Sequence, residues 1–125
     1  MSVLKSHIIS GIIMLFLFVC QTGYTQESGV ASYYADFFEG RKMANGDRYN
    51  PEELTCAHPT APLGSIMKIA RIDCPDQSVI VRVVDRGPFV KGRIIDLSKR
   101  AARELGILHQ GIADVVVGLV KNPID

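Results

Sequence analysis

The stretch over residues 79–98, VIVRVVDRGPFVKGRIIDLS, constrains the fold most, because it joins two apolar runs that each end in an acid. Valines at every second position of residues 79–83 are typical of a strand with one buried face. Gly87-Pro88 cannot continue a sheet ladder, so the chain must turn just after Asp85. A second apolar run follows and ends in Asp96. A carboxylate at the point where a rigid strand becomes a constrained turn is well placed for acid–base chemistry, so Asp85 is the first candidate for a functional residue.

The N-terminal residues are typical of an export signal. Lys5 precedes an apolar run over residues 8–20, and a small-x-small site follows at residues 23–25. The apolar run is shorter than the roughly 20 residues that span a bilayer, which disfavours a membrane helix. Cys20 raises the alternative of a lipid anchor, but the preceding valine is too bulky for a lipidated cysteine, and we do not expect one. Residues 1–25 are therefore predicted to be a signal peptide.

A chain of 125 residues allows one domain with one core. We place this domain at residues 26–121, followed by a short tail over 122–125. We expect it in the periplasm, at the cell envelope or secreted, with no membrane span in the mature chain. Without Lys5, the totals of 14 basic and 13 acidic residues become 13 and 13. This balance argues against a nucleic-acid partner, because nucleic-acid-binding surfaces are strongly basic.

Two cysteines, Cys56 and Cys74, remain beyond the predicted signal. A small exported domain gains stability from a disulfide, so this pair is a disulfide candidate. The pair does not have CxxC spacing and the histidines are scattered, so we expect neither a metal site nor a cofactor.

The remaining pattern predicts a small closed barrel. Ser98 and Gly106 are suitable caps for a short helix over residues 99–105. Residues 35–50 form a long glycine-containing loop, and loops of this length tend to carry function. Five or six short strands with one helix favour a barrel over a sandwich. Apart from the short run before Asp96, the strands are predicted over residues 30–34, 65–72, 79–84 and 112–120.

Four polar residues are candidates for chemistry, and each has a structural alternative. Asp85, at the mouth of a barrel, would be partly desolvated and could donate a proton, or it could cap the turn or pair with Arg86. His58 lies at a strand-to-turn junction, where a structural histidine is the alternative. Asp47 could be an ordinary turn acid, and Asp96 could stabilise the start of the helix. Four aromatic residues could be core residues or a stacking surface for sugar rings: Tyr33, Tyr34, Phe37 and Phe38.

Three segments together resemble the rare lipoprotein A (RlpA) family: GVASYYADFFEGRKMANGDRY at residues 29–49, TCAHPTAPLGS at 55–65 and VIVRVVDRGPFVKGRIIDLSKRAARELGI at 79–107. They occur in that family's order and spacing and cover nearly all of residues 29–120. The resemblance implies a mostly β fold, a six-stranded double-psi β-barrel with one short helix, and an exported lytic transglycosylase acting on peptidoglycan. More distantly, the barrel resembles that of expansins and of a family of endoglucanases.

The family's motifs imply roles for individual residues. Its catalytic aspartate falls on Asp85, its histidine on His58, and its acidic residue after the Asn-Gly pair on Asp47, so the resemblance implies that these three are the catalytic residues. The last position is a departure, because the family usually has glutamate there. A shortening by one carbon can displace a proton-transfer group by about 1 Å, so either the loop compensates or Asp47 binds substrate. Four further residues are predicted to bind substrate: Tyr34, Asn45, Arg86 and Asp96.

The resemblance also implies the reaction. Lytic transglycosylases cleave the β-1,4 bond between N-acetylmuramic acid (MurNAc) and N-acetylglucosamine (GlcNAc) without water, and leave a 1,6-anhydro-MurNAc end. We therefore expect a monomer that acts on peptidoglycan glycan strands, with Asp85 as the proton-transfer residue. The alternative is a non-catalytic, expansin-like module that binds or loosens wall polysaccharide, which the shortened acid Asp47 favours. A secreted protease inhibitor is a weaker reading, since the set of Asp85, His58 and Asp47 argues against it.

Overall fold

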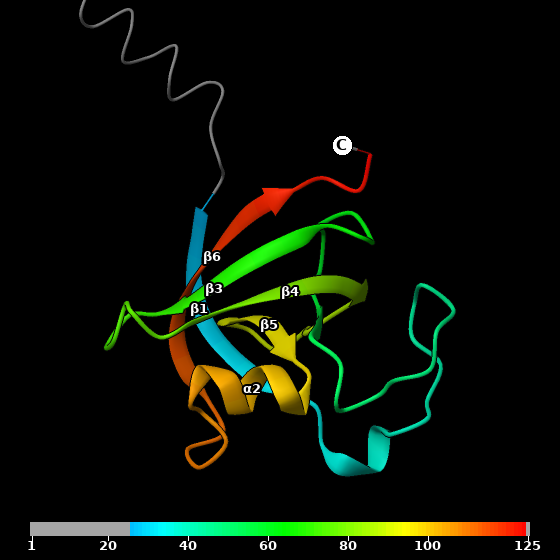
Figure 1. Ribbon diagram of the computed structural model, residues 1–125, viewed down its shortest axis with the longest axis horizontal. Coiled ribbons are helices and arrows are strands. Elements are labelled where there is room, and N and C mark those ends of the chain that lie inside the picture. The colour runs from blue at the N-terminus through cyan, green and yellow to red at the C-terminus, as the bar shows by residue number, and fades with distance from the viewer. Residues whose placement is uncertain (1–25, 125) are drawn as a thin grey trace, which may run out of the picture.

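The computed structural model describes residues 26–124, and the predicted export signal with Cys20 lies outside these residues. Six strands close into a barrel in the order β1-β5-β2-β4-β3-β6, with one α-helix beside it (Figure 1). The predicted closed barrel of six strands with one short helix is thereby confirmed. The elements are β1 (Gln26–Tyr33), the 3-10 helix η1 (Asp36–Phe38), β2 (Thr55–Ala57), β3 (Ile66–Arg71), β4 (Ser78–Asp85), β5 (Arg93–Leu97), α2 (Lys99–Leu105) and β6 (Ala113–Lys121).

Two strand pairs of the barrel are parallel, β1 with β5 and β2 with β4, and the other four are antiparallel. The first parallel pair brings Ser32 opposite Asp96, and the second brings Ala57 opposite Asp85. Each candidate acid therefore lies near the carboxyl end of a strand that has a parallel neighbour. This topology places two acids from different parts of the sequence at one end of the barrel.

The period-two pattern of β4 is the clearest link from sequence to core. Val79, Val81 and Val83 are buried, whereas Ile80 and Arg82 between them are exposed. The same alternation in the other strands fills the barrel with branched aliphatic side chains, because successive side chains of a strand point to opposite faces. The largest fully buried side chains are those of Ile69, Ile95, Leu97, Leu105, Ile107, Val81, Val83, Val115 and Val117, together with Ser65 and Ser98.

The helix α2 lies at the end of the barrel opposite the start of β1 (Figure 1). Its predicted caps are both present: the Ser98 hydroxyl accepts a hydrogen bond from the Ala101 N–H at 3.2 Å, and Gly106 adopts a left-handed φ of 80°. The buried face of the helix consists of Ala101, Ala102 and Leu105. Within residues 26–124, no helix has both the length and the apolar character needed to cross a membrane.

Strand β1 begins at Gln26, four residues before the start predicted from the sequence. Residues 26–29 pair antiparallel with residues 115–118 of β6. This pairing uses main-chain hydrogen bonds and leaves the side chains of 26–28 exposed, so these residues gave no apolar signal. The early start places Glu27 on the barrel wall, where its carboxylate contacts His58.

The predicted disulfide is wrong, because Cys56 and Cys74 are both free thiols. Cys56 lies in the core and is paired with Val83 in the β2–β4 ladder, whereas Cys74 lies in the exposed turn before β4. Five residues of strand separate Ser78 from Val83, about 17 Å at 3.3 Å per residue. A disulfide needs Cα atoms within about 7 Å of each other, so these two cysteines are too far apart. Burial raises the pKa of the Cys56 thiol and keeps it protonated.

Candidate active site

A cavity of about 500 Å³ opens at the barrel end where β4 and β5 finish, and both candidate acids, Asp85 and Asp96, line it. Aromatic side chains form much of the rest of its wall, among them Tyr34, Tyr49 and Phe89. A concave site with a few convergent polar groups among aromatic surfaces is the usual form of a ligand site. The cavity is therefore the candidate active site.

Asp85 is the last residue of β4 and is half-buried. One carboxylate oxygen accepts the Ala44 N–H at 2.9 Å, and the other accepts the hydroxyl of Tyr34. The chain turns immediately afterwards at Gly87, whose φ of 112° suits glycine alone among ordinary residues. Two donors on two different segments thus hold the carboxylate at the edge of the cavity.

Tyr34 is a donor that keeps its proton. Burial, followed by the hydrogen bond to Asp85, raises the pKa of the Tyr34 hydroxyl above its ordinary value. Its ring packs against Tyr49 with centroids 4.7 Å apart and against Phe38 at 5.6 Å. The structure therefore brings the predicted substrate-binding residue Tyr34 into contact with Asp85, in a packed environment that fixes its orientation.

Asp96 lies on β5 and contributes a second carboxylate to the same cavity. Its Oδ1 accepts the hydroxyl of Ser32, the residue opposite it on β1. The N-cap of α2 is Ser98, as predicted, while the Asp96 side chain bonds Ser32 on β1. Ser32 was missed by sequence reasoning, since its partner is 64 residues away and no local pattern signals the contact.

The imidazole of His58 contacts Glu27 and its own turn, and it makes no hydrogen bond with the Asp85 side chain. His58 is only 6% exposed, and it lines a second cavity, of about 400 Å³, together with Glu27. Its Nδ1 accepts the N–H groups of Thr60 at 3.2 Å and Ala61 at 2.9 Å, and its Nε2 contacts the Glu27 carboxylate. Its main-chain N–H donates to the Asp85 carbonyl at 3.1 Å. The structure thus joins His58 to Asp85 through the main chain and not through their side chains.

Asp47 is also separate from the cavity that holds Asp85. Its carboxylate is exposed and accepts from the side-chain amide of Asn45 at 3.0 Å, while its N–H donates to the Asn45 carbonyl oxygen Oδ1 at 3.0 Å. It lines a different cavity, beside Arg82. The loop instead reaches the site through its main chain, because Asn45 N–H donates to the Val84 carbonyl at 3.0 Å, one residue after the Ala44 contact. Neither Asp47 nor Asn45 lines the cavity around Asp85.

Arg86 lies in the cavity wall but does not pair with Asp85. Its Nη1 donates to the carbonyl of Ala61 at 2.5 Å and to that of His58 at 3.2 Å. The alternative of an Asp85–Arg86 ion pair is therefore wrong. The guanidinium ties the turn after β2 to the end of β4.

The rim of the cavity carries exposed aromatic rings. Phe89 lines the cavity and is 83% exposed, while Phe37 is 70% exposed and stacks at 4.3 Å on the ring of Phe38, which also lines the cavity. The guanidinium of Arg41 lies 4.9 Å from the centre of the Phe38 ring, a cation–π arrangement. Tyr33 also lines the cavity, and its hydroxyl donates to the Leu108 carbonyl at 2.8 Å. Exposed rings beside two carboxylates suit the apolar faces of sugars.

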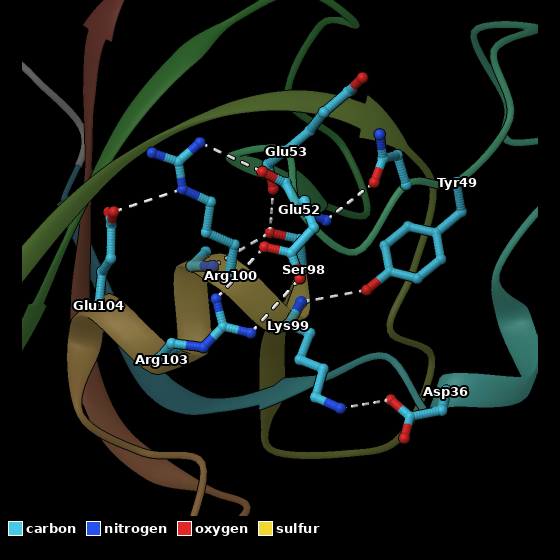
Figure 2. A network of polar contacts seen from close by, with 11 residues as sticks. Asp36, Tyr49, Glu52, Glu53, Ser98, Lys99, Arg100, Arg103 and Glu104 are labelled. Carbon is cyan, nitrogen blue, oxygen red and sulfur yellow. Dashed lines mark hydrogen bonds and ion pairs between the residues drawn. The ribbon is translucent and has the colours of Figure 1, made fainter.

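A polar network anchors the loop of residues 35–53 to the start of α2 (Figure 2). The Tyr49 hydroxyl accepts the Lys99 N–H at 3.1 Å, and the Lys99 ammonium contacts Asp36 at 3.0 Å. The Ser98 hydroxyl donates to the Glu53 carbonyl at 2.6 Å. Because Tyr49 lines the cavity, this network fixes one of its walls.

Comparisons with known proteins agree with this architecture. The model of the family described as "Lytic transglycolase" matches residues 26–117. "Endolytic peptidoglycan transglycosylase RlpA" of Pasteurella multocida is 48% identical over 100 residues, which cover 80% of this chain and 33% of that protein. "Probable endolytic peptidoglycan transglycosylase RlpA" of Synechocystis sp. is 46% identical over 95 residues, which cover 76% of this chain and 29% of that protein. The chain spans about a third of the length of these curated relatives.

Solved structures share the barrel. The Streptomyces papain inhibitor has a TM-score of 0.62 at 22% identity, covering 78% of this chain and 96% of that one. The expansin of Clavibacter michiganensis has a TM-score of 0.60 at 22% identity, covering 79% and 52%. At this identity the likeness concerns the fold alone, whereas the family match and the RlpA relatives concern the sequence as well. The chain therefore belongs to the lytic transglycolase family, as a double-psi β-barrel of the RlpA type.

Proposed function

We propose that this chain is an endolytic peptidoglycan transglycosylase that cleaves the MurNAc–GlcNAc β-1,4 bond and leaves a 1,6-anhydro-MurNAc end. The observation that carries the proposal is the half-buried carboxylate of Asp85, oriented by Tyr34 and Ala44 at the edge of the cavity that also holds Asp96. The RlpA relatives, which are named as endolytic peptidoglycan transglycosylases and are 46–48% identical over the barrel, support the same reaction.

In this mechanism Asp85 moves one proton in each direction. It donates a proton to the glycosidic oxygen as the bond from that oxygen to the MurNAc C1 breaks. It then accepts the proton of the MurNAc 6-hydroxyl as that oxygen bonds to C1, so the carboxyl returns to its starting state. A carboxylate has about four lone-pair positions, and Tyr34 and Ala44 use two of them, so Asp85 keeps positions for the substrate.

Asp96 has a different task in the proposal. The transition state has positive charge on the sugar ring, and a second carboxylate in the same cavity stabilises that charge. The Ser32 hydroxyl holds Asp96 in a fixed orientation, so the carboxylate needs little reorganisation as the charge develops. The ring-closing oxygen belongs to the substrate, so neither acid has to hold a water molecule.

The proposal extends to the setting of the domain. We infer that residues 1–25 direct export and that the domain over residues 26–121 acts on glycan strands at the cell envelope as a monomer. The support is the order of Lys5, the apolar run and the small-x-small site in the sequence, together with a substrate that lies outside the cytoplasm.

The decisive test replaces Asp85 by asparagine and measures anhydromuropeptide release from purified peptidoglycan by mass spectrometry. Asn keeps the shape and an acceptor oxygen but cannot donate an acidic proton, so we expect product release to fall at least about 100-fold. Asp76→Asn is the matched control, because Asp76 is an exposed acid in the turn between β3 and β4. Undiminished release by Asp85→Asn, with both variants folded, contradicts the proposed role.

A second candidate function is a non-catalytic module that binds wall polysaccharide. It is favoured by the placement of His58 and Asp47 outside the cavity, which leaves Asp85 alone of the three predicted catalytic groups. Incubation with glycan strands separates the two functions. Binding without any anhydro product from the wild-type protein selects the non-catalytic module.

A further inference from the structure

A chain of polar contacts leads from the outside of β1 to the wall of the candidate active site. It begins at Glu27, whose half-exposed carboxylate contacts Nε2 of the buried His58. It continues through the turn after β2, where the N–H groups of Thr60 and Ala61 donate to His58 Nδ1. It ends at Arg86, which lines the cavity. The catalytic scheme above uses neither Glu27 nor His58.

The contacts define the protonation of the His58 ring. A nitrogen that accepts two main-chain N–H groups carries no proton, so Nδ1 of His58 is the unprotonated nitrogen. In a neutral imidazole the proton then lies on Nε2, which donates it to the Glu27 carboxylate. Glu27 therefore selects the tautomer that allows His58 to close its own turn.

The turn of residues 58–61 determines where the Arg86 side chain lies. The carbonyl groups of Ala61 and His58, at the two ends of the turn, accept from Arg86 Nη1 at 2.5 and 3.2 Å. The His58 N–H also donates to the carbonyl of Asp85, the residue before Arg86. A shift of this turn is thus transmitted to the end of β4 by three hydrogen bonds.

We propose that Glu27 is a positioning residue of the active site, acting through His58 and its turn on Arg86 and the end of β4. Glu27 touches no reacting atom. It fixes the ring of His58, the ring closes the turn, and the turn holds the guanidinium at the cavity wall. This assigns a positioning role to His58 too, which the family motif places among the predicted catalytic residues. The catalytic part of the inference rests on the proposed function.

The kinetic test compares Glu27→Ala with Glu27→Gln, using soluble glycan strands as substrate. The Gln side chain keeps an oxygen that accepts the Nε2 proton, so we expect it to retain most of the activity. The Ala variant releases the ring, and we expect kcat to fall about tenfold with KM within about twofold, because small displacements of catalytic groups cost rate. Gln26→Ala is the matched control, since Gln26 lines the same cavity as His58 and precedes Glu27 on β1.

Nitrogen-15 NMR of the His58 ring tests the contact chain independently of activity. We expect the Nε2-protonated tautomer in the wild type, a mixed or altered signal in Glu27→Ala, and shifted Arg86 guanidinium signals in the same variant. A wild-type ring protonated on Nδ1, or unchanged ring signals and kcat in Glu27→Ala, overturns the inference. The inference is also overturned if Glu27→Gln fails to restore the activity that Glu27→Ala loses and if that loss follows the loss of stability. If the wild type releases no anhydro product, the proposed function fails. The NMR signals of the His58 ring and of the Arg86 guanidinium then decide alone whether Glu27 acts through His58 on Arg86.

Discussion

Replacing Ser98 by alanine tests how strongly one hydroxyl holds the junction of β5 and α2. The Ser98 side chain is 1% exposed and makes three contacts. It accepts the Ala101 N–H at 3.2 Å as the helix N-cap, accepts the Thr55 N–H at 3.4 Å, and donates to the Glu53 carbonyl at 2.6 Å. Figure 2 shows this hydroxyl at the centre of the network that anchors the loop to the helix.

The expected cost follows from these contacts. Loss of a serine N-cap costs about 1 kcal/mol. Loss of the donor to the Glu53 carbonyl adds about 1 kcal/mol, at the lower end of the range for an unpaired polar group because Glu53 is exposed and water reaches it. The Thr55 contact is long and contributes little. We therefore expect Ser98→Ala to lower the free energy of unfolding by about 2 kcal/mol, which for a domain of this size lowers Tm by about 8–16 °C.

Urea and thermal unfolding followed by circular dichroism measure this change. Ser78→Ala is the control, because Ser78 is exposed at the start of β4, and we expect its free energy of unfolding to stay within about 0.5 kcal/mol of the wild type. A Ser98→Ala protein that also stays within about 0.5 kcal/mol would refute the assigned role of the hydroxyl.

Three further predictions concern the site and the thiols. Tyr34→Phe removes a donor to the Asp85 carboxylate. We expect the folded variant to release anhydro product about tenfold more slowly, since a hydrogen bond to a charged group is worth at least about 1.4 kcal/mol. An unchanged rate contradicts this prediction. The pKa of Tyr34 is raised in the folded state, so the unfolded chain releases the tyrosine proton at lower pH than the folded protein does. The contribution of Tyr34 to the free energy of unfolding is therefore complete below the ordinary tyrosine pKa of about 10 and is lost as pH rises further. Urea unfolding across that pH range should therefore show a steeper loss of stability in the wild type than in Tyr34→Phe. Alkylation of the native protein should modify exposed Cys74 and leave buried Cys56 unmodified until unfolding, as peptide mass mapping will show; equal labelling of both would contradict the described core.

The sequence was sufficient for those features that depend on local pattern. The alternating valines of β4 predicted a strand with one buried face, and Gly87-Pro88 predicted where it ends, so Asp85 was placed correctly at a strand end. Ser98 and Gly106 predicted both ends of α2. Each of these predictions rests on a physical preference of the residue itself or of its near neighbours.

Side-chain direction in the loops could not be predicted in this way. The His58 ring contacts Glu27, 31 residues earlier, and this partner lies before the strand that the sequence predicted over residues 30–34. The family motif identifies His58 and Asp47 as members of one group of residues, but it does not state which side of the backbone they occupy. Asp47 bonds its near neighbour Asn45, a local contact that the Asn-Gly turn does suggest. The motif therefore predicts which residues belong together, but not the direction of their side chains.

The same limit of local sequence patterns explains why the disulfide prediction was wrong. Oxidising conditions and a small core are general arguments for joining Cys56 and Cys74, and both apply to this sequence. The outcome depends instead on strand register: Cys56 faces Val83 near the far end of β4, while Cys74 lies before its start. Register is a property of the closed barrel and is not visible in the spacing of two cysteines.

The order of strands in the barrel has a consequence for folding kinetics. Among the described strands, β3 and β4 alone are neighbours both in sequence and in the barrel, and every other pair joins segments separated by at least one further element. Chains dominated by such distant pairings fold slowly, because the entropic cost of closing long loops comes before the stabilising contacts form. The cavity needs the ends of β1, β4 and β5 together, so its two carboxylates meet only when the barrel is nearly complete. A partly folded chain carries both acids without the cavity between them, and the proposed glycan cleavage should consequently be among the last properties to return on refolding.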